Sequence, residues 1–380
     1  MRVAFDVTSC AKPRRGGIAT YGWELIAACA RAAPQHEYAL LVRPHHWLAR
    51  QHVDGLAAAV AQATGRPPAS LRPRLLLEFL PGQGLGQAEV LHSIGVRLPP
   101  RGRSRALRVA TLYDINVFEF PELSDARWRE RRQARIRETI PRADRVIVTS
   151  RAGAEALAAH LDVPPERVRV IPIGVDTARF RPLPPQAVRP VLERHALLGR
   201  PYVLHVGAFS PRKNQRGLLA AFARAALPAD WVLVLGGPDG EHAGALRQEA
   251  RALGLPDDRV RLPGWLAEND YPALLCGAAF MVCASLHEGF GIPVIEAQAC
   301  GAPVLSSHRG ALPETVGEAG VLFDPSDTDV FAAALVDLAG DPALRARLSA
   351  AGPPRVAQHF TWDRIARQTL AVYAEAAGAR

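Results

Sequence analysis

Two glutamates, Glu288 and Glu296, flank a glycine-rich turn and carry the strongest chemical signal in the chain. Gly289 and Gly291 allow backbone N–H groups to approach an anion closely, and Pro293 is typical of a first helical turn, whose amides also favour an anion. Each carboxylate can accept hydrogen bonds from a pair of sugar hydroxyls. A site for phosphates and hydroxyls suits a nucleotide sugar. The alternative is an ordinary strand-to-helix connection with two solvated glutamates.

A second candidate anion site follows the apolar run 202–206, where the chain continues Gly-Ala-Phe-Ser-Pro-Arg-Lys-Asn. Gly207 permits a sharp turn, and Arg212 and Lys213 come next to a predicted helix start. A guanidinium fork and an ammonium group both suit a diphosphate. Lys213 is one of two lysines in a chain that otherwise uses arginine. The alternative is a pair of solvated cations at a helix start.

Apolar runs that alternate with helix-like segments must position these motifs. The strands are predicted at 3–7, 38–42, 90–92, 108–112, 145–149 and 168–171, and then at 202–206, 231–235, 259–262, 279–283, 304–306 and 321–323. Helices are predicted at 21–33, 127–140, 153–161, 217–226, 244–253, 329–338 and 362–376. Apolar strands separated by helices indicate parallel sheets covered on both faces, so the two series predict an α/β protein with two Rossmann-like, doubly wound domains. The proline-rich run 180–190 is the predicted linker, with the boundary near residue 182.

The run 288–301, Glu-Gly-Phe-Gly-Ile-Pro-Val-Ile-Glu-Ala-Gln-Ala-Cys-Gly, resembles the Glu-x7-Glu element of the retaining glycosyltransferases of family 4. The runs 113–122 and 211–214 point to the mannosyltransferase-like subgroup. The resemblance implies the GT-B fold, with two Rossmann-like domains facing across a cleft and a C-terminal helix that crosses back to the first domain. It implies an acceptor-binding domain at 1–182 with about 362–380, and a nucleotide-sugar-binding domain at 183–361.

The resemblance also implies roles for residues of the second domain. Glu288 would contact the donor sugar and Glu296 the donor ribose, while Lys213 and Arg212 would stabilise the leaving diphosphate. Many relatives carry an arginine where this chain has Ala208, so Arg212 would have to do that work. The remaining donor-binding candidates are the turn residues Gly289, Phe290, Gly291 and Ile292, with Gly207, Gly236 and Leu266 from neighbouring strand-end loops.

Two segments of the first domain correspond to further family positions. Gly17, in the run Arg14-Arg15-Gly16-Gly17, corresponds to a glycine-rich loop that approaches the donor phosphates. Tyr113-Asp114 corresponds to a His-Asp pair, which makes Asp114 a catalytic candidate and Tyr113 a residue of the acceptor side. A phenol cannot be protonated near neutral pH as imidazole can, so the role of the family histidine is in question. The alternative for Tyr113 is simple packing at a strand end.

The positive charge is concentrated in the first half of the chain. Residues 1–180 hold 27 Lys and Arg against 17 Asp and Glu, whereas the whole chain has a net charge of +9. Arg127, Arg131 and Arg135 share one face of a predicted helix, with Arg101, Arg103, Arg105 and Arg108 upstream. A solvated face is one explanation. The other is contact between Arg131 and its neighbours and anionic lipid headgroups or a polyprenyl-diphosphate-linked acceptor. Nucleic acid is not expected, because aromatic residues make up only 6% and no binding motif accompanies the charge.

These observations predict an enzyme that transfers a hexose, with retention, to a lipid-linked or growing polysaccharide acceptor. The resemblance favours mannose from GDP-mannose, without a cofactor or metal ion. Alternatives are a UDP- or dTDP-sugar donor, a nucleotide-sugar epimerase, or a non-catalytic binding protein. Neither a signal peptide nor a long apolar span is expected, and the five cysteines fit reduced thiols. The predicted location is the cytoplasm, with peripheral contact at the inner face of the membrane.

Overall fold

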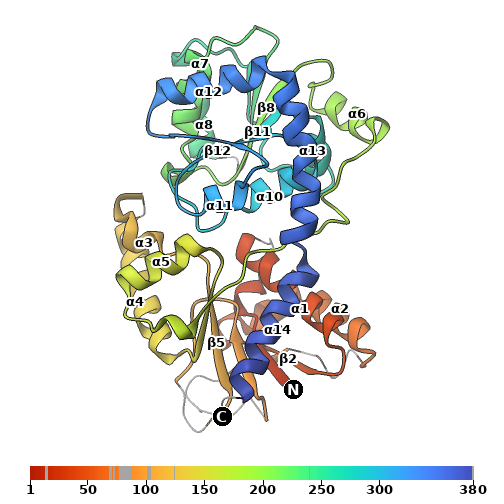
Figure 1. Cartoon of the computed structure of the whole chain (residues 1–380), viewed down its shortest axis with the longest axis vertical. Helices are drawn as coiled ribbons and strands as arrows, with labels where there is room; N and C mark the ends of the chain where they lie inside the picture. The colour runs from red at the N-terminus through yellow and green to blue at the C-terminus, as the bar shows by residue number, and fades with distance from the viewer. Residues whose placement is uncertain are drawn as a thin grey trace. The chain divides into compact units, whose positions relative to one another are not determined.

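The chain forms two compact units (Figure 1). The computed structural model describes residues 1–12, 16–67, 71, 73–76, 87–100, 104–123, 125–238 and 240–378. Unit 1 comprises Met1–Gly174 with Thr361–Arg380, and unit 2 comprises Val175–Phe360. Each unit is a parallel sheet flanked by helices, so the prediction of two doubly wound α/β domains is confirmed.

Unit 1 is built on a seven-stranded parallel sheet with the order β3-β2-β1-β4-β5-β6-β7. The strands are β1 (Arg2–Asp6), β2 (Glu37–Val42), β3 (Arg74–Leu75), β4 (Val90–Ser93), β5 (Leu107–Leu112), β6 (Arg145–Val148) and β7 (Val168–Val170). Its α-helices are α1 (Gly17–Ala32), α2 (Asp54–Thr64), α3 (Asn116–Glu119), α4 (Ala126–Thr139), α5 (Arg151–His160) and α14 (Trp362–Gly378). The strand order reverses between β1 and β4, which makes their carboxyl ends the expected ligand side of this sheet.

The last helix, α14, packs on α1 and completes unit 1. Trp362 meets the ring of Tyr21 edge-on at a centroid distance of 5.7 Å. The Tyr373 hydroxyl lies 2.6 Å from Nδ1 of His92, whose Nε2 lies 2.8 Å from the Thr111 hydroxyl. Burial lowers the pKa of His92 to about 3, so its imidazole is neutral and structural. The predicted return of the C-terminal helix to the first domain is confirmed.

Unit 2 is built on a six-stranded parallel sheet with the order β10-β9-β8-β11-β12-β13. The strands are β8 (Tyr202–Val206), β9 (Val232–Gly236), β10 (Val260–Arg261), β11 (Phe280–Cys283), β12 (Val304–Ser307) and β13 (Val321–Phe323). The α-helices are α6 (Pro185–Arg194), α7 (Gln215–Arg224), α8 (Glu241–Ala252), α9 (Tyr271–Gly277), α10 (Ile292–Ala299), α11 (Leu312–Val316), α12 (Thr328–Gly340) and α13 (Pro342–His359). Here the strand order reverses between β8 and β11.

Two differences from the predicted elements involve prolines. The run 180–190, predicted to be a linker, contains the start of α6, because Pro185 occupies a first-turn position where a missing N–H costs nothing. Helix α13 was not predicted and contains Pro353 and Pro354. It forms nonetheless because it packs closely on α10 and buries Leu348 and Val356.

Candidate functional site

The two predicted anion sites meet at the carboxyl ends of β8 and β11. These strands are adjacent and parallel, with Phe280 paired to Val203 and Met281 to Leu204. From β8 the chain passes through a short 3-10 helix, Pro211–Lys213, into α7, and from β11 it passes through the turn 284–291 into α10. Lys213 and Glu288 therefore lie where the strand order of this sheet reverses, between β8 and β11. Open parallel sheets bind their ligands at such a point.

Glu288 is the centre of this site. Its Oε1 accepts hydrogen bonds from Lys213 Nζ at 2.5 Å and from Ser285 Oγ at 2.7 Å. Its Oε2 lies 2.8 Å from Nη1 of Arg212, so one carboxylate is shared by two cations. The residue is only 8% exposed, which keeps water from weakening these contacts.

The charges of this cluster determine how Glu288 ionises. Burial by itself would raise the pKa of the carboxyl group. The positive charges of Lys213 and Arg212 and the hydrogen bonds to the carboxylate outweigh burial and lower the pKa to about 2. Glu288 is therefore ionised at neutral pH, and the cluster of two cations and one carboxylate keeps an excess of one positive charge.

Backbone contacts fix the two loops against each other. The amide of Leu286 donates to the carbonyl oxygen of Arg212 at 2.8 Å. The Arg212 guanidinium in turn donates to the carbonyl oxygen of His287 at 2.8 Å. These bonds hold the cations beside the glutamate through main-chain atoms as well as through the ion pair.

The turn after Glu288 presents backbone amides. Gly291 has φ +102°, a conformation that favours glycine, and an added Cβ would also meet Leu312 at 2.7 Å. The Phe290 side chain is buried, and its carbonyl oxygen accepts a hydrogen bond of 2.6 Å from the Thr315 hydroxyl. Among the described residues, the N–H groups of Phe290, Gly291 and Ile292 find no hydrogen-bond acceptor. The turn can therefore bind an anion through its backbone.

The stretch that follows β12 contacts the turn that carries Glu288. The amide of Ala311 donates to the carbonyl oxygen of Glu288 at 2.9 Å. Gly310 lies so close that an added Cβ would stand 2.5 Å from the same oxygen. The run 306–314 therefore has a structural place next to the glutamate turn.

Glu296 lies in α10, and its environment differs from that of Glu288. Its Oε2 accepts a hydrogen bond of 2.9 Å from the Tyr271 hydroxyl. Burial raises the pKa of Glu296 to about 7, because the bond from Tyr271 and the charge of Arg179 offset burial only in part. The carboxyl group therefore changes its charge near neutral pH.

The predicted donor-binding glycines follow the neighbouring strands of the same sheet. Gly207 follows β8, and its Cα faces Lys213, whose side chain would lie 3.4 Å from an added Cβ. The Gly207 amide donates to the carbonyl oxygen of Gly236 at 2.9 Å. Leu266 covers Gly236, where an added Cβ would meet its side chain at 2.8 Å. The structure thus brings Gly207, Gly236 and Leu266 together at the edge that carries Lys213.

Three buried polar residues of the site were missed by the sequence analysis. Ser285 bonds Glu288 directly. His205 in β8 contacts the carbonyl oxygen of Val282 through Nδ1 at 3.0 Å, and its Nε2 lies 3.2 Å from the amide nitrogen of Gln215. The same Gln215 nitrogen donates to the carbonyl oxygen of Ala208 at 3.1 Å and so anchors the loop after β8.

Four predicted residues belong to unit 1. Tyr113 is buried, packs edge-on against Tyr21, and donates a hydrogen bond of 2.6 Å to the carbonyl oxygen of Ile94. The hydroxyl donates its proton within the core, as the packing alternative for Tyr113 predicts, and the acceptor-side role stays a prediction. Asp114 is half-buried after β5, and Arg131 is exposed on α4. Gly17 begins α1, whereas Arg14 and Arg15 lie outside the described residues, as do Arg101 and Arg103.

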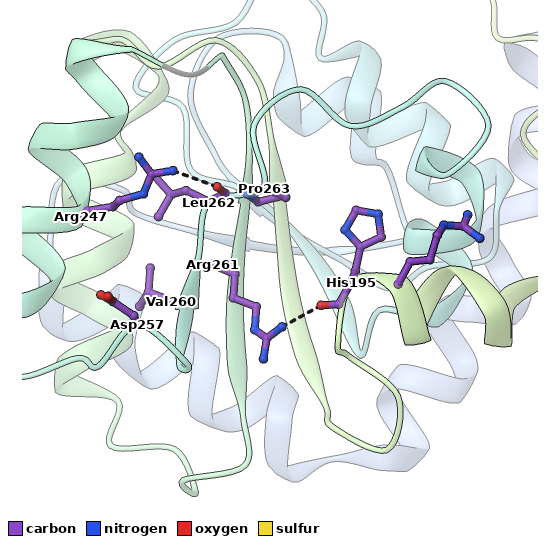
Figure 2. Close-up of a pocket in the computed structure, with 8 residues that line it drawn as sticks. His195, Arg247, Asp257, Val260, Arg261, Leu262 and Pro263 are labelled. Atoms are coloured by element: carbon purple, nitrogen blue, oxygen red, sulfur yellow. Dashed lines mark hydrogen bonds between the residues drawn. The ribbon is translucent and has the colours of Figure 1, made fainter.

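A cavity of about 380 Å³ lies at the β10 edge of unit 2 (Figure 2). None of the predicted site residues lines it. Arg247 donates to the carbonyl oxygen of Leu262 at 3.1 Å, and Arg261 donates to that of His195 at 2.7 Å. These arginines connect α8, β10 and the end of α6, which gives the cavity walls a structural role.

Asp327 and Asp329 have an Asp-x-Asp spacing, although the metal-free prediction assumed that the sequence has no such motif. Asp327 caps α12 by accepting hydrogen bonds from the amides of Asp329 and Val330, and Asp329 pairs with Arg224. Over the described part of the chain, no three His, Cys, Asp or Glu side chains gather in a metal-binding arrangement. Within the same residues, no helix has the length and apolar character needed to span a bilayer.

Family models match both halves of the chain. Residues 15–179 match "Glycosyltransferase Family 4", and residues 193–355 match "Glycosyl transferases group 1". A GDP-mannose-dependent alpha-(1-6)-phosphatidylinositol monomannoside mannosyltransferase from Mycolicibacterium smegmatis is 30% identical over 94% of both chains. The O-antigen chain mannosyltransferase B of Escherichia coli is 30% identical over 70% of this chain and 69% of its own. A D-inositol 3-phosphate glycosyltransferase from Salinispora tropica is 38% identical, and the match spans about half of that protein, 52%.

Solved structures share the whole fold. Sucrose-phosphate synthase from Thermosynechococcus elongatus aligns over 100% of both chains with a TM-score of 0.75 and 23% identity. Anabaena HepE in complex with UDP aligns over 98% of this chain and 99% of its own, with a TM-score of 0.75 and 19% identity. At these identities the likeness establishes the architecture alone.

Proposed function

Because this chain belongs to the GT-B glycosyltransferases of the group 1 and family 4 type, we propose that it transfers a hexose from a nucleotide sugar to a glycan acceptor with retention of configuration. The donor that we propose is GDP-mannose. The mannosyltransferases of Mycolicibacterium smegmatis and Escherichia coli among its relatives support this choice.

The observation that carries the proposal is the cluster of Lys213, Arg212 and Glu288 beside unbonded turn amides. The cluster has an excess of one positive charge, and the amides of Phe290 and Gly291 add partial positive charge. Such an arrangement suits the diphosphate of a nucleotide sugar better than a neutral ligand, and it does so without a metal ion.

In this proposal the protein acts mainly through electrostatics. As the bond between the sugar and the diphosphate breaks, negative charge grows on the leaving oxygen, and Lys213 Nζ and the guanidinium of Arg212 stabilise it. Glu288 accepts hydrogen bonds from the donor sugar, and Glu296 accepts them from the ribose hydroxyls. The ion pair with Glu288 holds Lys213 in place before the donor binds. Asp114 and Gly17, in unit 1, remain candidates for contacts with the reacting sugar and the donor phosphates.

The acceptor that we propose is lipid-linked or a growing polysaccharide. Arg127 and Arg131 are exposed on α4 next to Trp128, which is 51% exposed. Exposed cations beside an exposed tryptophan suit the anionic surface of a membrane. Peripheral attachment at the inner, cytoplasmic face is therefore part of the proposal.

The test is a donor screen followed by product analysis. The full chain is incubated with GDP-, UDP- and dTDP-hexoses, binding is followed by thermal shift, and the anomeric configuration of transferred sugar is read by NMR. We expect the largest shift with GDP-mannose and an α-linked product. A UDP- or dTDP-sugar that binds more tightly would overturn the donor assignment, and a β-linked product would overturn retention. Isomerised donor without any acceptor would establish an epimerase instead.

A further inference from the structure

Asn214 has an unusual conformation for a residue that precedes a helix. It lies between the 3-10 helix Pro211–Lys213 and α7, with φ and ψ of 55° and 37°, in the left-handed region. The residue before a helix normally has an extended backbone, and an asparagine there accepts a hydrogen bond from the first turn. Asn214 does neither, since its backbone is left-handed and its side chain makes no capping bond to α7. Capping of α7 therefore does not explain why asparagine occupies this position.

The Asn214 side chain connects the loop after β8 to the loop after β13. Its Nδ2 donates to the carbonyl oxygen of Pro325 at 3.1 Å, and Pro325 is buried. In the sheet, β11 and β12 lie between these two strands, so the bond spans both of them. Gly217 leaves room for the amide, because an added Cβ at Gly217 would collide with the Asn214 side chain. The bond to Pro325 therefore favours a single conformation of Asn214.

Helix α7 is fixed by packing, whereas the turn before it depends on Asn214 for its direction. One face of α7 is buried, and the helix packs on α12 (Figure 1). The turn is closed by its own backbone bonds. The Lys213 amide donates to the carbonyl oxygen of Ser210 at 3.0 Å, and the Asn214 amide donates to that of Pro211 at 3.1 Å. The φ angle of Asn214 therefore sets how this closed turn is directed relative to α7.

The direction of the turn determines where the Lys213 ammonium group lies. Lys213 Nζ donates to Oε1 of Glu288 at 2.5 Å. The Lys213 side chain also lies along Gly207, where an added Cβ would be 3.4 Å from Cε. Both contacts would change if the turn left α7 in another direction. A displacement of about 1 Å in a group that acts on the reacting atoms can lower a rate by about 10²-fold.

We propose that Asn214 is a positioning residue for Lys213. Its left-handed backbone sets the direction of the turn, and its bond to Pro325 favours that backbone conformation. The inference rests on the proposed transferase activity, in which Lys213 stabilises the leaving diphosphate. Asn214 itself does not contact the substrate, so a change at this residue should affect kcat more than KM for the donor.

The test compares two variants that both lose the bond to Pro325. Valine strongly disfavours a positive φ, whereas glycine adopts it freely. Asn214→Val should lower kcat by about tenfold or more, with KM for GDP-mannose within about a factor of two. Asn214→Gly should keep kcat within about threefold of the wild-type value. The matched control is Ala226→Gly, at a left-handed residue with φ +46° that follows α7, and it should leave both constants unchanged.

A second measurement does not depend on catalysis. The chain has two lysines, Lys12 and Lys213, so labelling with ¹⁵Nζ-lysine allows each ammonium group to be followed by NMR. The Lys213 signal is identified by its absence from Lys213→Ala. We expect Asn214→Val to shift or broaden this signal, and Asn214→Gly and Ala226→Gly to retain it. The Lys12 signal should be the same in all variants.

The outcomes separate this inference from the proposed function. A Lys213 signal in Asn214→Val that matches the wild type would overturn the positioning role, whatever happens to kcat. Asn214→Gly that is as impaired as Asn214→Val in both measurements would also overturn it, because the backbone conformation would then not be the cause. If the wild-type protein transfers no sugar, yet the Lys213 signal moves in Asn214→Val and returns in Asn214→Gly, the proposed function fails and the positioning of Lys213 stands.

Asn214→Val is compared with the wild type by circular dichroism before either measurement. If it is misfolded, Asn214→Ala takes its place. Alanine also lacks the amide and disfavours a positive φ less than valine does, and the protein already holds alanine in this conformation at Ala196 and Ala226. Asn214→Ala should shift the Lys213 signal in the same direction, and an unchanged signal would overturn the proposal.

Discussion

Units 1 and 2 each place a carboxylate in an ion pair at the strands next to the reversal of strand order, and the two clusters differ in the number of cations and in how exposed they are. In unit 1, Asp6 is bound by the single guanidinium of Arg43. In unit 2, Glu288 is shared between Lys213 and Arg212. The side chains of Asp6 and Arg43 are 4% and 2% exposed, whereas those of Lys213 and Arg212 are 13% and 26% exposed.

The difference separates a structural ion pair from one that can bind a ligand. Removing either partner of a buried, one-to-one pair leaves a buried charge without compensation. When two cations share one carboxylate, either of them can turn to a ligand while the other keeps the carboxylate paired. The predictions below test this contrast.

The largest effect is expected for Lys213→Ala. Transfer should fall by about 10²–10³-fold, the usual effect of removing one group that stabilises a transition-state charge. Stability should change little, because Arg212 and Ser285 still pair with Glu288. The measurements are kcat with saturating donor and the thermal midpoint. Lys12→Ala, at the other, exposed lysine, is the matched control and should be unaffected. Full activity in a folded Lys213→Ala variant would contradict the assignment of Lys213 to the leaving diphosphate.

Asp6→Asn should have the opposite effect to Lys213→Ala, because it should mainly reduce stability. The free energy of unfolding should fall by about 3–5 kcal/mol, because Arg43 stays buried without its carboxylate. Denaturant titration measures the loss. Replacing both partners, as Asp6→Leu with Arg43→Met, should recover most of it, since an apolar pair of similar size avoids the unpaired charge. If the double variant is no more stable than Asp6→Asn, the ion pair is not what limits stability here.

Glu296→Gln should remove the contribution of Glu296 to the pH dependence of stability and of KM for the donor. The pKa of Glu296 is raised from 4.5 to about 7, so this carboxyl group holds a proton in the folded protein that it loses in the unfolded chain, and the contribution of Glu296 to stability should fall as pH rises from about 4.5 to 7. The ionised form accepts hydroxyl hydrogen bonds, so KM for the donor should decrease as pH rises through about 7. In Glu296→Gln the KM profile should be flat over this range, and the difference in unfolding free energy between wild type and variant should decrease as pH rises. A wild-type KM that does not change with pH would argue against contact between Glu296 and the ribose.

The smallest effect is expected for Tyr113→Phe. The change removes the hydrogen bond to the carbonyl oxygen of Ile94 and should cost about 1 kcal/mol of stability. Activity should stay within a factor of two if the phenol serves only the core. A large loss of kcat with unchanged stability would return Tyr113 to the reacting site.

The sequence predicted the sheets more accurately than the helices that cover them. Buried parallel strands are continuous apolar runs, so both β8 and β13 were predicted with their observed bounds. The two-residue strand β3 is too short to give such a signal. Proline concealed α6 and α13, because the energy of packing a helix face is not visible in local sequence patterns.

The site was predicted in part for a similar reason. Glycine spacing and charge type identified Lys213 and Glu288, but their direct contact depends on β8 and β11 being neighbours, which is a property of topology. Ser285, His205 and Gln215 could not be found, because a single serine, histidine or glutamine has no spacing that marks it as part of a site. The hydrogen bond of Tyr113 could not be predicted, because its partner, the carbonyl of Ile94, belongs to another strand end.

The position of α14 has a consequence for the order in which the protein is made. The core of unit 1 includes Trp362, Ile365 and Tyr373, which are buried and lie in the last helix of the chain. Unit 2 ends at Phe360, before that helix. During synthesis, the second unit therefore has all of its sequence available before the first one does. The amino-terminal sheet therefore keeps α1 uncovered until α14 has been synthesised.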